Sequence, residues 1–435
     1  MKNTETEEKS PLKKKFIQPS ESTVANTIIV HISKLESFIC SLNPAASLYE
    51  DVTDEDDIRN CFIQLKEYLK TQNIKLITIE DALLLENCYE DLFKLAKEAL
   101  NYERETKVGE IDIENVKNKR RKSSFEEYYL YSSEEYKEKT LKKFSKKNLI
   151  NIILSRPSIK LKHIETDTFI ESTSINFTPL GNLIFCRDQQ ITTKKGVVMG
   201  KTRTNQRKYE HVIMKQVFKN LNYEIIGEVK NGYLEGGDFF VARENLSMLG
   251  IGLRTNIEAG NYLMENDLLG TRYMALVYDE NDKDQQRMHL DTYFNILNDD
   301  NAVVIDFDEV GKHEHKKIDR KVYYFDNDKN AKEIISDNNE IKNKVGEYKL
   351  IKKYDNFYNF LDDMKFNYIK ITHQEQKEYM INFLNIGNNI VISVNKDFEN
   401  KVKDLGITVK YFDCQPILNM YGGMHCMTQV SRGAL

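Results

Sequence analysis

The spacing of apolar residues divides the chain into helical and strand-rich parts. Residues 57–71 place apolar side chains three and four positions apart, which predicts an amphipathic helix. The segment 24–35 alternates apolar and polar residues and predicts a strand with its exit, and 74–77 predicts a second strand. Thr78, Glu80 and Asp81 then form the start signal of another helix. We assign residues 24–83 to the first part of a larger catalytic domain.

Residues 80–155 differ from the rest in their helical period and their density of Lys and Glu. They predict an α-helical insertion, which we place at 84–157. The basic run 117–122 within it is typical of a solvated helix end or loop, with nuclear targeting or nucleic-acid binding as the alternative. Residues 1–23 contain no apolar run, and we expect them to form a disordered tail.

From residue 158 to residue 435 short apolar runs predict strands with helices between them. Predicted strands are 183–186, 196–199, 223–226, 239–242, 247–250, 273–277, 303–307, 368–371, 383–386, 390–394 and 408–411. Predicted helices are 204–220, 257–266, 356–365 and 374–382. Runs of two strands and a helix recur, which favours an α/β fold of repeated modules over one doubly wound sheet.

Composition and charge narrow the class of protein. The chain has 435 residues, of which 40% are hydrophobic and 30% charged, so it can build a large core and is expected to be soluble. Its net charge of −5 argues against a general nucleic-acid binder. No run reaches the roughly 18 apolar residues of a membrane span. The 6 cysteines have no CxxC spacing, which predicts reduced thiols in a cytoplasmic protein and no zinc site.

A cysteine follows two glycines near the C-terminus, in the order Gly422, Gly423, Met424, His425, Cys426. A pair of glycines allows positive φ and a close approach of the backbone to a ligand. We interpret Cys426 as a nucleophile. The alternative is a buried, inert thiol, because free Cys is among the most buried residue types. We expect His425 to orient this loop.

Five further segments concentrate polar residues around predicted strands. They are 181–188, 207–210, 234–239, 250–255 and 288–293. Each one alone can be an ordinary turn, strand end or helix start. His289 and Asp291 lie two positions apart, so on a strand they would project from one face. Together with Cys426 the segments supply these candidates: Asn182, Asp188, Arg207, Glu235, Arg254, His289 and Asp291.

This set suits a planar cation with an anionic tail. A guanidinium presents a fork of N–H donors that matches carboxylates, and arginines in turn bind a carboxylate. A Cys426 thiolate could attack the guanidinium carbon, and the substrate's own charge would help to form that thiolate. His289 could act as the acid for departing ammonia and the base for water. Glu235 could orient His289.

The motifs FCRD, RxxE, EGGD, GxxxRT, MHLDT and GGxHCMT, in this order, resemble those of arginine deiminases, within the superfamily of guanidino-group modifying enzymes and amidinotransferases. They cover residues 175–435, and 24–83 is similar to the family's N-terminal module. The resemblance implies a five-module α/β propeller of ββαβ units with pseudo-fivefold symmetry and an inserted helical domain. It also implies hydrolysis of L-arginine to L-citrulline and ammonia, with no metal and no cofactor.

The resemblance implies roles for single residues. Cys426 is then the nucleophile of a covalent S-alkylthiouronium intermediate, and His289 with Glu235 transfers protons. Asp188 and Asp291 hold the guanidinium. The groups that bind the rest of the substrate are Asn182, Arg207, Arg254, Gly423 and Tyr421.

The sequence departs from the family pattern at four positions. Tyr421 stands where an arginine or another gating residue is frequent, and the other departures are Met424, Cys186 and Gln189. They leave open related reactions of the superfamily, on agmatine, on dimethylarginine, or on arginine with an amidino-group acceptor, although Arg207 and Arg254 favour a substrate with a free carboxylate and so argue against agmatine. An inactive guanidino-binding scaffold is a further alternative. We expect a homodimer or higher homo-oligomer, with no nucleic-acid or membrane partner.

Overall fold

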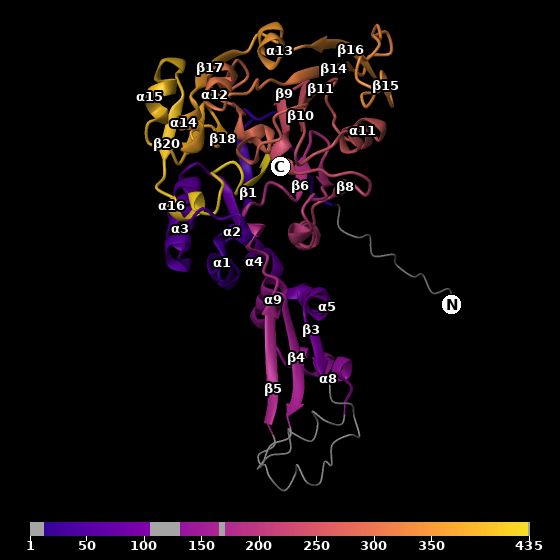
Figure 1. Ribbon diagram of the computed structural model, residues 1–435, viewed down its shortest axis with the longest axis vertical. Coiled ribbons are helices and arrows are strands. Elements are labelled where there is room, and N and C mark those ends of the chain that lie inside the picture. Colours follow the sequence, from indigo (N-terminus) through magenta and orange to yellow (C-terminus); the bar gives the residue numbers. More distant parts are fainter. Residues whose placement is uncertain (1–12, 105–130, 165–169, 434–435) are drawn as a thin grey trace, which may run out of the picture.

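The computed structural model describes residues 13–104, 131–164 and 170–433. Figure 1 shows a main body with a lobe projecting from it, and helix α9 (Lys146–Ser155) lies at the junction. The other elements of the lobe are α5 (Tyr89–Ala99), β3 (Asn101–Arg104), α8 (Ser133–Leu141), β4 (Pro157–Ile164) and β5 (Ile170–Phe177).

Five sheets of the main body share one pairing pattern within the described ranges. The first strand of each is antiparallel to the second, and the second is parallel to the third. In that order the strands are β6 (Gln190–Thr192), β7 (Val197–Met199), β8 (Ile225–Glu228); β9 (Phe239–Arg243), β10 (Leu246–Ile251), β11 (Tyr273–Tyr278); β12 (Phe294–Ile296), β13 (Asn301–Ile305), β17 (Asn367–Ile371); β18 (Leu384–Gly387), β19 (Ile390–Ser393), β20 (Thr408–Tyr411); and β21 (Gln429–Arg432), β1 (Ala25–Val30), β2 (Lys75–Thr78). The last strand thus pairs with the first.

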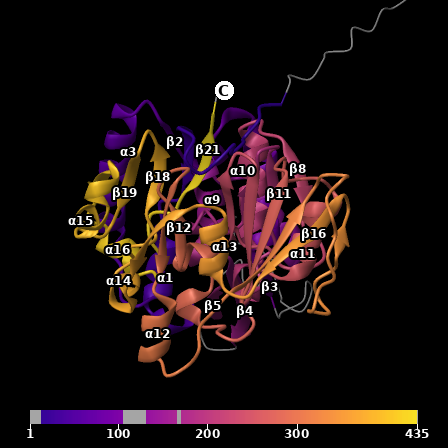
Figure 2. The same cartoon turned by 90° about the horizontal axis from the view of Figure 1, so that it is seen from above.

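One sheet is wider than the others. Strands β14 (Lys321–Asp326), β16 (Tyr348–Tyr354) and β15 (Lys344–Val345) extend it beyond β11. Seen from above in Figure 2, β18 and β19 lie on one side of the main body, β11 and β16 on the other, and β12 and β21 between them. The protein is therefore a mixed α/β fold.

Eleven further helices lie in the described part of the main body. They are α1 (Leu35–Ser41), α2 (Pro44–Ser47), α3 (Glu55–Thr71), α4 (Ile79–Leu83), α10 (Glu210–Asn220), α11 (Ile257–Glu265), α12 (Phe307–His313), α13 (Phe357–Asp363), α14 (His373–Lys377), α15 (Phe398–Val402) and α16 (Gln415–Leu418). Short 3₁₀ turns are Glu86–Cys88, Gly181–Ile184, Asn205–Arg207, Gly236–Asp238, Gln285–Arg287, Leu290–Thr292 and Lys403–Leu405. Helix α3, predicted at 57–71, begins after an Asp54 side chain that accepts the Asp56 N–H.

The insertion predicted to be helical contains a sheet as well. Strands β3, β4 and β5 form three strands of the lobe, and β4 pairs with β5 as an antiparallel hairpin. That hairpin crosses the predicted boundary at residue 157. The sequences of β4 and β5 are rich in polar residues, a weaker strand signal than the helical signal of the Lys/Glu-rich segments beside them. The basic run 117–122 lies outside the described residues.

Two predicted strands in functional motifs are wrong. Residues 183–186 fall on the 3₁₀ turn Gly181–Ile184 and the loop after it, and His289 and Asp291 border or lie within the turn Leu290–Thr292. The first segment is a short apolar run, and the second alternates apolar with polar residues; over so few positions periodicity cannot separate either from a strand. The strands that follow these turns, β6 and β12, have three residues each and were not predicted.

Residues 13–23 correct the prediction of a disordered tail over 1–23. This segment, which we call the N-terminal strap, hydrogen-bonds through its backbone to Asn222, Thr193 and Val241. Phe16 is fully buried and packs edge-on against Phe218 and Tyr223. Composition predicted disorder because the strap is short and its buried groups are partly polar. Residues 1–12 lie outside the described ranges.

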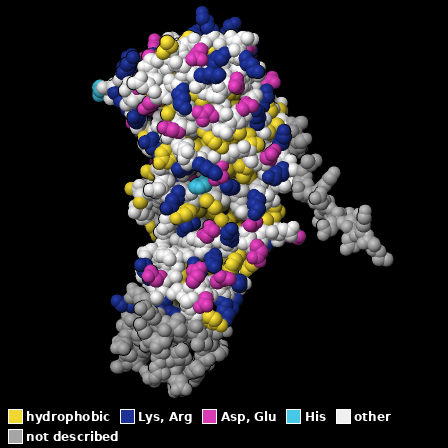
Figure 3. Space-filling model, turned by 90° about the vertical axis from the view of Figure 1, so that its right-hand side faces the viewer, with side chains coloured by type: hydrophobic (Ala, Val, Ile, Leu, Met, Phe, Trp, Pro, Cys, Tyr) yellow, Lys and Arg dark blue, Asp and Glu magenta, His cyan; other side chains and the backbone are white. Residues whose placement is uncertain are grey.

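The surface charge and the length of the helices are relevant to the expectation that the protein has no nucleic-acid or membrane partner. On the face shown in Figure 3, basic and acidic side chains are interspersed and gather into no single basic patch. Among the described helices, none combines the length and the apolar character needed to cross a membrane.

The strap's contribution to stability can be measured. Phe16→Ala should lower the free energy of unfolding by about 3–5 kcal/mol, because it removes a large ring from a packed core. Val24→Ala, at a side chain that is 43% exposed, is the control and should cost no more than about 0.5 kcal/mol. Urea titration followed by circular dichroism measures both. Equal losses would mean that the strap does not pack in solution.

Candidate active site

Predicted site residues lie just ahead of the first strand in four of the five sheets. Asp188 precedes β6, Glu235 precedes β9, Asp291 precedes β12 and Cys426 precedes β21. Asn382, which was not predicted, occupies the corresponding place before β18. We call these five segments the lead-in segments. Residues 100 or more positions apart in the chain therefore meet at one place, as the motifs predicted.

The lead-in segments hydrogen-bond to one another in a closed ring. One backbone bond joins Arg187 N–H to the Cys426 carbonyl at 3.1 Å, and another joins Gly236 N–H to the Asp188 carbonyl at 3.2 Å. The other three bonds use one side chain each: Leu290 N–H to Asp238 Oδ1 (3.0 Å), Asn382 Nδ2 to the Asp291 carbonyl (3.2 Å), and Cys426 N–H to Asn382 Oδ1 (3.1 Å).

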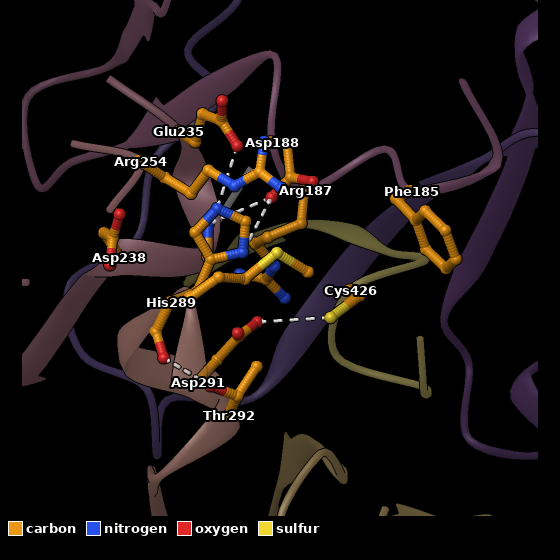
Figure 4. Close-up of polar contacts among 12 residues, drawn as sticks. Phe185, Arg187, Asp188, Glu235, Asp238, Arg254, His289, Asp291, Thr292 and Cys426 are labelled. Carbon is orange, nitrogen blue, oxygen red and sulfur yellow. Dashed lines mark hydrogen bonds and ion pairs between the residues drawn. The ribbon is translucent and has the colours of Figure 1, made fainter. Parts of the chain in front are cut away.

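Cys426 lies against a cavity of about 340 Å³. Its Sγ accepts a hydrogen bond from Asn382 Nδ2 at 3.1 Å and lies 3.5 Å from Asp291 Oδ2; Figure 4 shows the sulfur facing Asp291. Burial, with the charges of Asp291 and Asp188, raises the pKa of the Cys426 thiol well above its ordinary value. Without a nearby cation the thiol therefore stays protonated.

Close packing, and not the positive φ that was predicted, explains the two glycines before Cys426. A Cβ on Gly422 would lie 2.2 Å from Phe185 Cε1, and one on Gly423 would lie 2.8 Å from Asn382 Oδ1. Close approach to these neighbours, not positive φ, requires glycine there. The left-handed residue of this turn is Tyr421, at φ 72°. A bulky residue held in that region is strained, which is common at functional sites.

His289 and Glu235 form a buried pair. His289 Nε2 lies 2.9 Å from Glu235 Oε2, and His289 Nδ1 lies 3.9 Å from Asp188 Oδ1. Burial alone would lower the pKa of His289, but the carboxylates of Asp188, Glu235 and Asp238 outweigh it and raise that pKa to about 9. The imidazolium in turn lowers the pKa of Glu235 against the effect of burial. His289 is thus held as an acid beside the nucleophile.

The Arg207 guanidinium forms its hydrogen bonds within the protein. Its Nη1 donates to Asp188 Oδ2 at 2.7 Å, its Nε to Glu210 Oε2 at 2.9 Å, and its Nη2 to the Asn182 carbonyl at 3.2 Å. Arg254 is less engaged, since Nη2 donates to Gln285 at 3.1 Å while its buried Nε has no partner. Of the two predicted carboxylate ligands, Arg254 has the unused donor.

A second histidine lies on the other side of the nucleophile. His425 Nδ1 lies 2.7 Å from Asp291 Oδ2, and His425 Nε2 lies 3.5 Å from Glu21 Oε1 of the strap. Asp291 Oδ1 is buried and has no hydrogen-bond partner among the residues that the structure describes. An unsatisfied buried carboxylate oxygen costs about 1–3 kcal/mol or more, so it is an acceptor ready for a donor.

The cavity combines apolar and polar walls. Tyr421 and Tyr379 meet edge-to-face at 6.5 Å between ring centroids, and both line it. Glu50 and Lys377 supply one charge of each sign. A larger polar groove of about 950 Å³ lies beside α11, and its lining includes none of the predicted site residues.

Two sets of side chains have the spacing to hold a metal ion. The ligand atoms of Asp188, Glu235 and His289 lie within 4.8 Å of one another. The Arg207 guanidinium is already 2.7 Å from Asp188 and 4.0 Å from Glu235, so a cation occupies this cluster. The second set, Asp282, Asp284 and Glu314, is paired with Arg287 and Lys316. Both sets thus favour internal ion pairs.

Sequence reasoning missed three site residues. Asn382 lies in a segment whose only signal was its position before a predicted hairpin. Glu21 was assigned to a disordered tail. Arg187 was part of a quoted motif but received no role, yet its Nε donates to the His425 carbonyl at 3.1 Å.

A family model for arginine deiminase matches residues 47–432 of the chain. The arginine deiminase of Limosilactobacillus reuteri is 27% identical over 173 residues, which cover 37% of this chain and 42% of that protein. Arginine deiminase 1 of Staphylococcus epidermidis is 23% identical over 309 residues, 66% of this chain and 71% of that protein. The chain spans 42% of the length of the Limosilactobacillus reuteri protein and 36% of that of the arginine deiminase of Oenococcus oeni.

Solved structures show a more distant likeness. A dimethylarginine dimethylaminohydrolase, solved as an adduct with 4-chloro-2-hydroxymethylpyridine, superposes with a TM-score of 0.48 at 13% identity. The match covers 93% of this chain and 99% of that one.

The contact of Asn382 with the sulfur can be tested by alkylation. Asn382→Ala should slow the reaction of Cys426 with iodoacetamide about tenfold at neutral pH, because a hydrogen bond to a charged group contributes about 1.5–3 kcal/mol. Asn385→Ala, in the strand that follows, removes bonds to the Ile296 and Leu297 carbonyls instead. It should leave the rate unchanged. A normal rate in Asn382→Ala would exclude its role at the sulfur.

Proposed function

The chain belongs to the arginine deiminase family, and from that premise we propose that it is an amidine hydrolase that converts L-arginine to L-citrulline and ammonia through a covalent adduct on Cys426. The observation that carries the proposal is the buried, unpartnered Oδ1 of Asp291 beside the Cys426 sulfur. A guanidinium N–H placed there would satisfy this oxygen and bring the guanidinium carbon to the thiol.

The arrival of the guanidinium creates the nucleophile. Its positive charge offsets Asp291 and Asp188, the two carboxylates that keep the thiol protonated, so the thiol releases its proton to solvent. The Cys426 thiolate then forms a bond to the guanidinium carbon. His289 donates its proton to the departing nitrogen, which leaves as ammonia when its bond to that carbon breaks, and a thiouronium stays on the sulfur.

The second half of the reaction returns the enzyme to its starting state. His289, now neutral, takes a proton from a water molecule that attacks the thiouronium carbon. The carbon–sulfur bond breaks, the hydroxyl proton on that carbon passes to the departing sulfur, and citrulline and the Cys426 thiol form. Glu235, at 2.9 Å from His289, favours the imidazolium at each proton transfer.

The amino-acid end of arginine has its own candidate ligands. We assign the α-carboxylate to Arg254, because Arg207 already binds Asp188 and Glu210. Arg207 then serves to hold Asp188 in place. Tyr421, Gly423 and Asn182 stay predicted contacts, with Tyr421 supported by its place in the cavity wall.

We also propose that the five sheets are the modules of a pseudo-fivefold propeller. Their common pairing pattern and the closed ring of lead-in segments support this arrangement. Cytoplasmic location and homo-oligomerisation stay predictions, as does the absence of a metal or cofactor.

The activity is tested by product analysis. Incubation with L-arginine should yield citrulline and ammonia in equal amounts, and Cys426→Ser should lower kcat at least about 10³-fold with its circular dichroism spectrum unchanged. The same assay is run in parallel with agmatine, with methylarginines, and with arginine plus glycine. Absence of citrulline from arginine, or substantial activity in the serine variant, would contradict the proposal.

The pH dependence of kcat tests the role of His289. In the complex with arginine, kcat should fall with rising pH as the His289 imidazolium loses its proton. The midpoint of this fall should lie at or below about 9, the pKa of His289 in the free site. Glu235→Gln removes a charge that raises the pKa of His289, so the falling limb should move to lower pH. Glu244→Gln, at an exposed side chain, should not move it. An unmoved limb in Glu235→Gln would exclude the pair.

A further inference from the structure

The N-terminal strap brings a carboxylate to the back of the nucleophile. Glu21 is fully buried, and its Oε1 accepts a hydrogen bond from Arg432 Nη2 at 3.1 Å. The same oxygen lies 3.5 Å from His425 Nε2, and His425 Nδ1 lies 2.7 Å from Asp291 Oδ2. Asp291 Oδ2 is in turn 3.5 Å from Cys426 Sγ. A continuous buried line of charged groups therefore runs from Arg432 to the sulfur.

His425 lies between two carboxylates. Its Nδ1 is 2.7 Å from Asp291 Oδ2, and its Nε2, 3.5 Å from Glu21 Oε1, has no hydrogen-bond partner among the described residues. A neutral ring that donated to Asp291 would direct the lone pair of Nε2 at Glu21. The ring also stacks on Phe240 at 5.1 Å between centroids and 12° between planes, and an aromatic face attracts a cation.

Glu21 is held as an anion. Burial would raise the pKa of its carboxyl, but Arg432, His425 and Arg187 outweigh burial and lower that pKa to about 2. Gln18 also donates a hydrogen bond to Glu21 Oε2. Glu21 can therefore act on His425 as a fixed negative charge.

The buried line of groups from Arg432 to the sulfur restricts the orientation of the Asp291 carboxylate. Because Asp291 Oδ2 is bound to His425, the carboxylate cannot rotate freely, and Oδ1 is left as its open acceptor. The pKa of Asp291, which burial would raise, is lowered by the hydrogen bond and charge of His425. The positive ring also offsets the charge of Asp291 beside the sulfur.

We propose that Glu21 and His425 are positioning residues of the reaction: Glu21 holds His425 as an imidazolium, and His425 fixes Asp291 and offsets its charge next to the Cys426 thiolate. The inference rests on the proposed function for the identity of the substrate. It adds to that function an N-terminal residue and a second histidine, neither of which touches the substrate.

Loss of the positive charge on His425 should change the pKa of Cys426 in one direction. Asp291 would then be an uncompensated anion 3.5 Å from the sulfur, and a nearby anion disfavours the thiolate. The pKa of Cys426 should therefore rise. The other titratable or charged groups that act on Cys426, Asp291 and Glu21 are Asp188, Tyr379, His289, Arg187 and Arg432. The variants below leave these groups in place.

Glu21→Gln and His425→Asn test the proposal by two readouts. Glutamine has the shape of Glu21 without the charge, and asparagine keeps an N–H near the position of His425 Nδ1. The pH profile of Cys426 alkylation by iodoacetamide, measured by peptide mass spectrometry, should move up by about one unit in each variant. At a pH below that midpoint, kcat for arginine should fall about tenfold, because a one-unit rise leaves one tenth of the thiolate. KM should change less than kcat.

Two further variants separate positioning from simple structural support. Glu21→Asp keeps the charge and should recover part of the loss. Ser20→Ala, in the same strap, touches only Ser22 and Thr23 through its side chain and should leave both readouts unchanged. A lower unfolding temperature with a wild-type alkylation profile in both Glu21→Gln and His425→Asn would overturn the inference. If the wild-type protein fails to convert arginine, the proposed function fails, and the alkylation profile still decides the role of Glu21.

Discussion

The closed ring of hydrogen bonds among the lead-in segments is the constraint on which the site depends. Each sheet contributes only three-residue to six-residue strands to this part of the molecule, too little to fix a side chain by itself. The ring joins each sheet to its two neighbours, so no lead-in segment can move without breaking two bonds. Backbone groups that face the centre, where water is scarce, must be paired. The ring satisfies them and thereby fixes where Asp188, Asp291 and Cys426 point.

Charge is arranged around the ring in two similar groups. On one side of the sulfur, His289 is paired with Glu235 and lies near Asp188; on the other side, His425 is paired with Asp291 and lies near Glu21. Arg207 and Arg432 complete the two groups. Buried ion pairs contribute little net stability, because desolvation offsets attraction. Their value here is that each charge is fixed in direction before the substrate arrives. In the proposed mechanism the first group exchanges a proton with the leaving nitrogen, and the second positions Asp291.

Motif chemistry proved more informative than periodicity. Charged residues in short segments predicted the convergence of Asp188, Glu235, His289, Asp291 and Cys426, although the strand predicted for His289 and Asp291 is a 3₁₀ turn. Long amphipathic patterns such as α3 and hairpins such as β9–β10 and β18–β19 were confirmed, because several residues contribute to each signal. Strands β6 and β12, with three residues, offer too few positions for a period. Asn382 has no charge and no motif, and its role follows only from its place in the ring. Glu21 was missed because isolated polar residues in a short strap look the same whether they are buried or solvated.

In the proposed mechanism, the protonated thiol lets the site discriminate between the substrate arginine and the product citrulline. Asp188 and Asp291 oppose ionisation of Cys426, so a ligand without positive charge cannot generate the thiolate. Arginine carries that charge at the reacting carbon, and citrulline does not. Once citrulline forms, the charge that the guanidinium supplied is gone, and the sulfur takes up a proton again. The same two anions that bind the guanidinium therefore suppress the nucleophile in its absence and weaken the hold on the neutral product. A buried cysteine between carboxylates, which looks inert in isolation, becomes reactive only when the ligand supplies the missing cation.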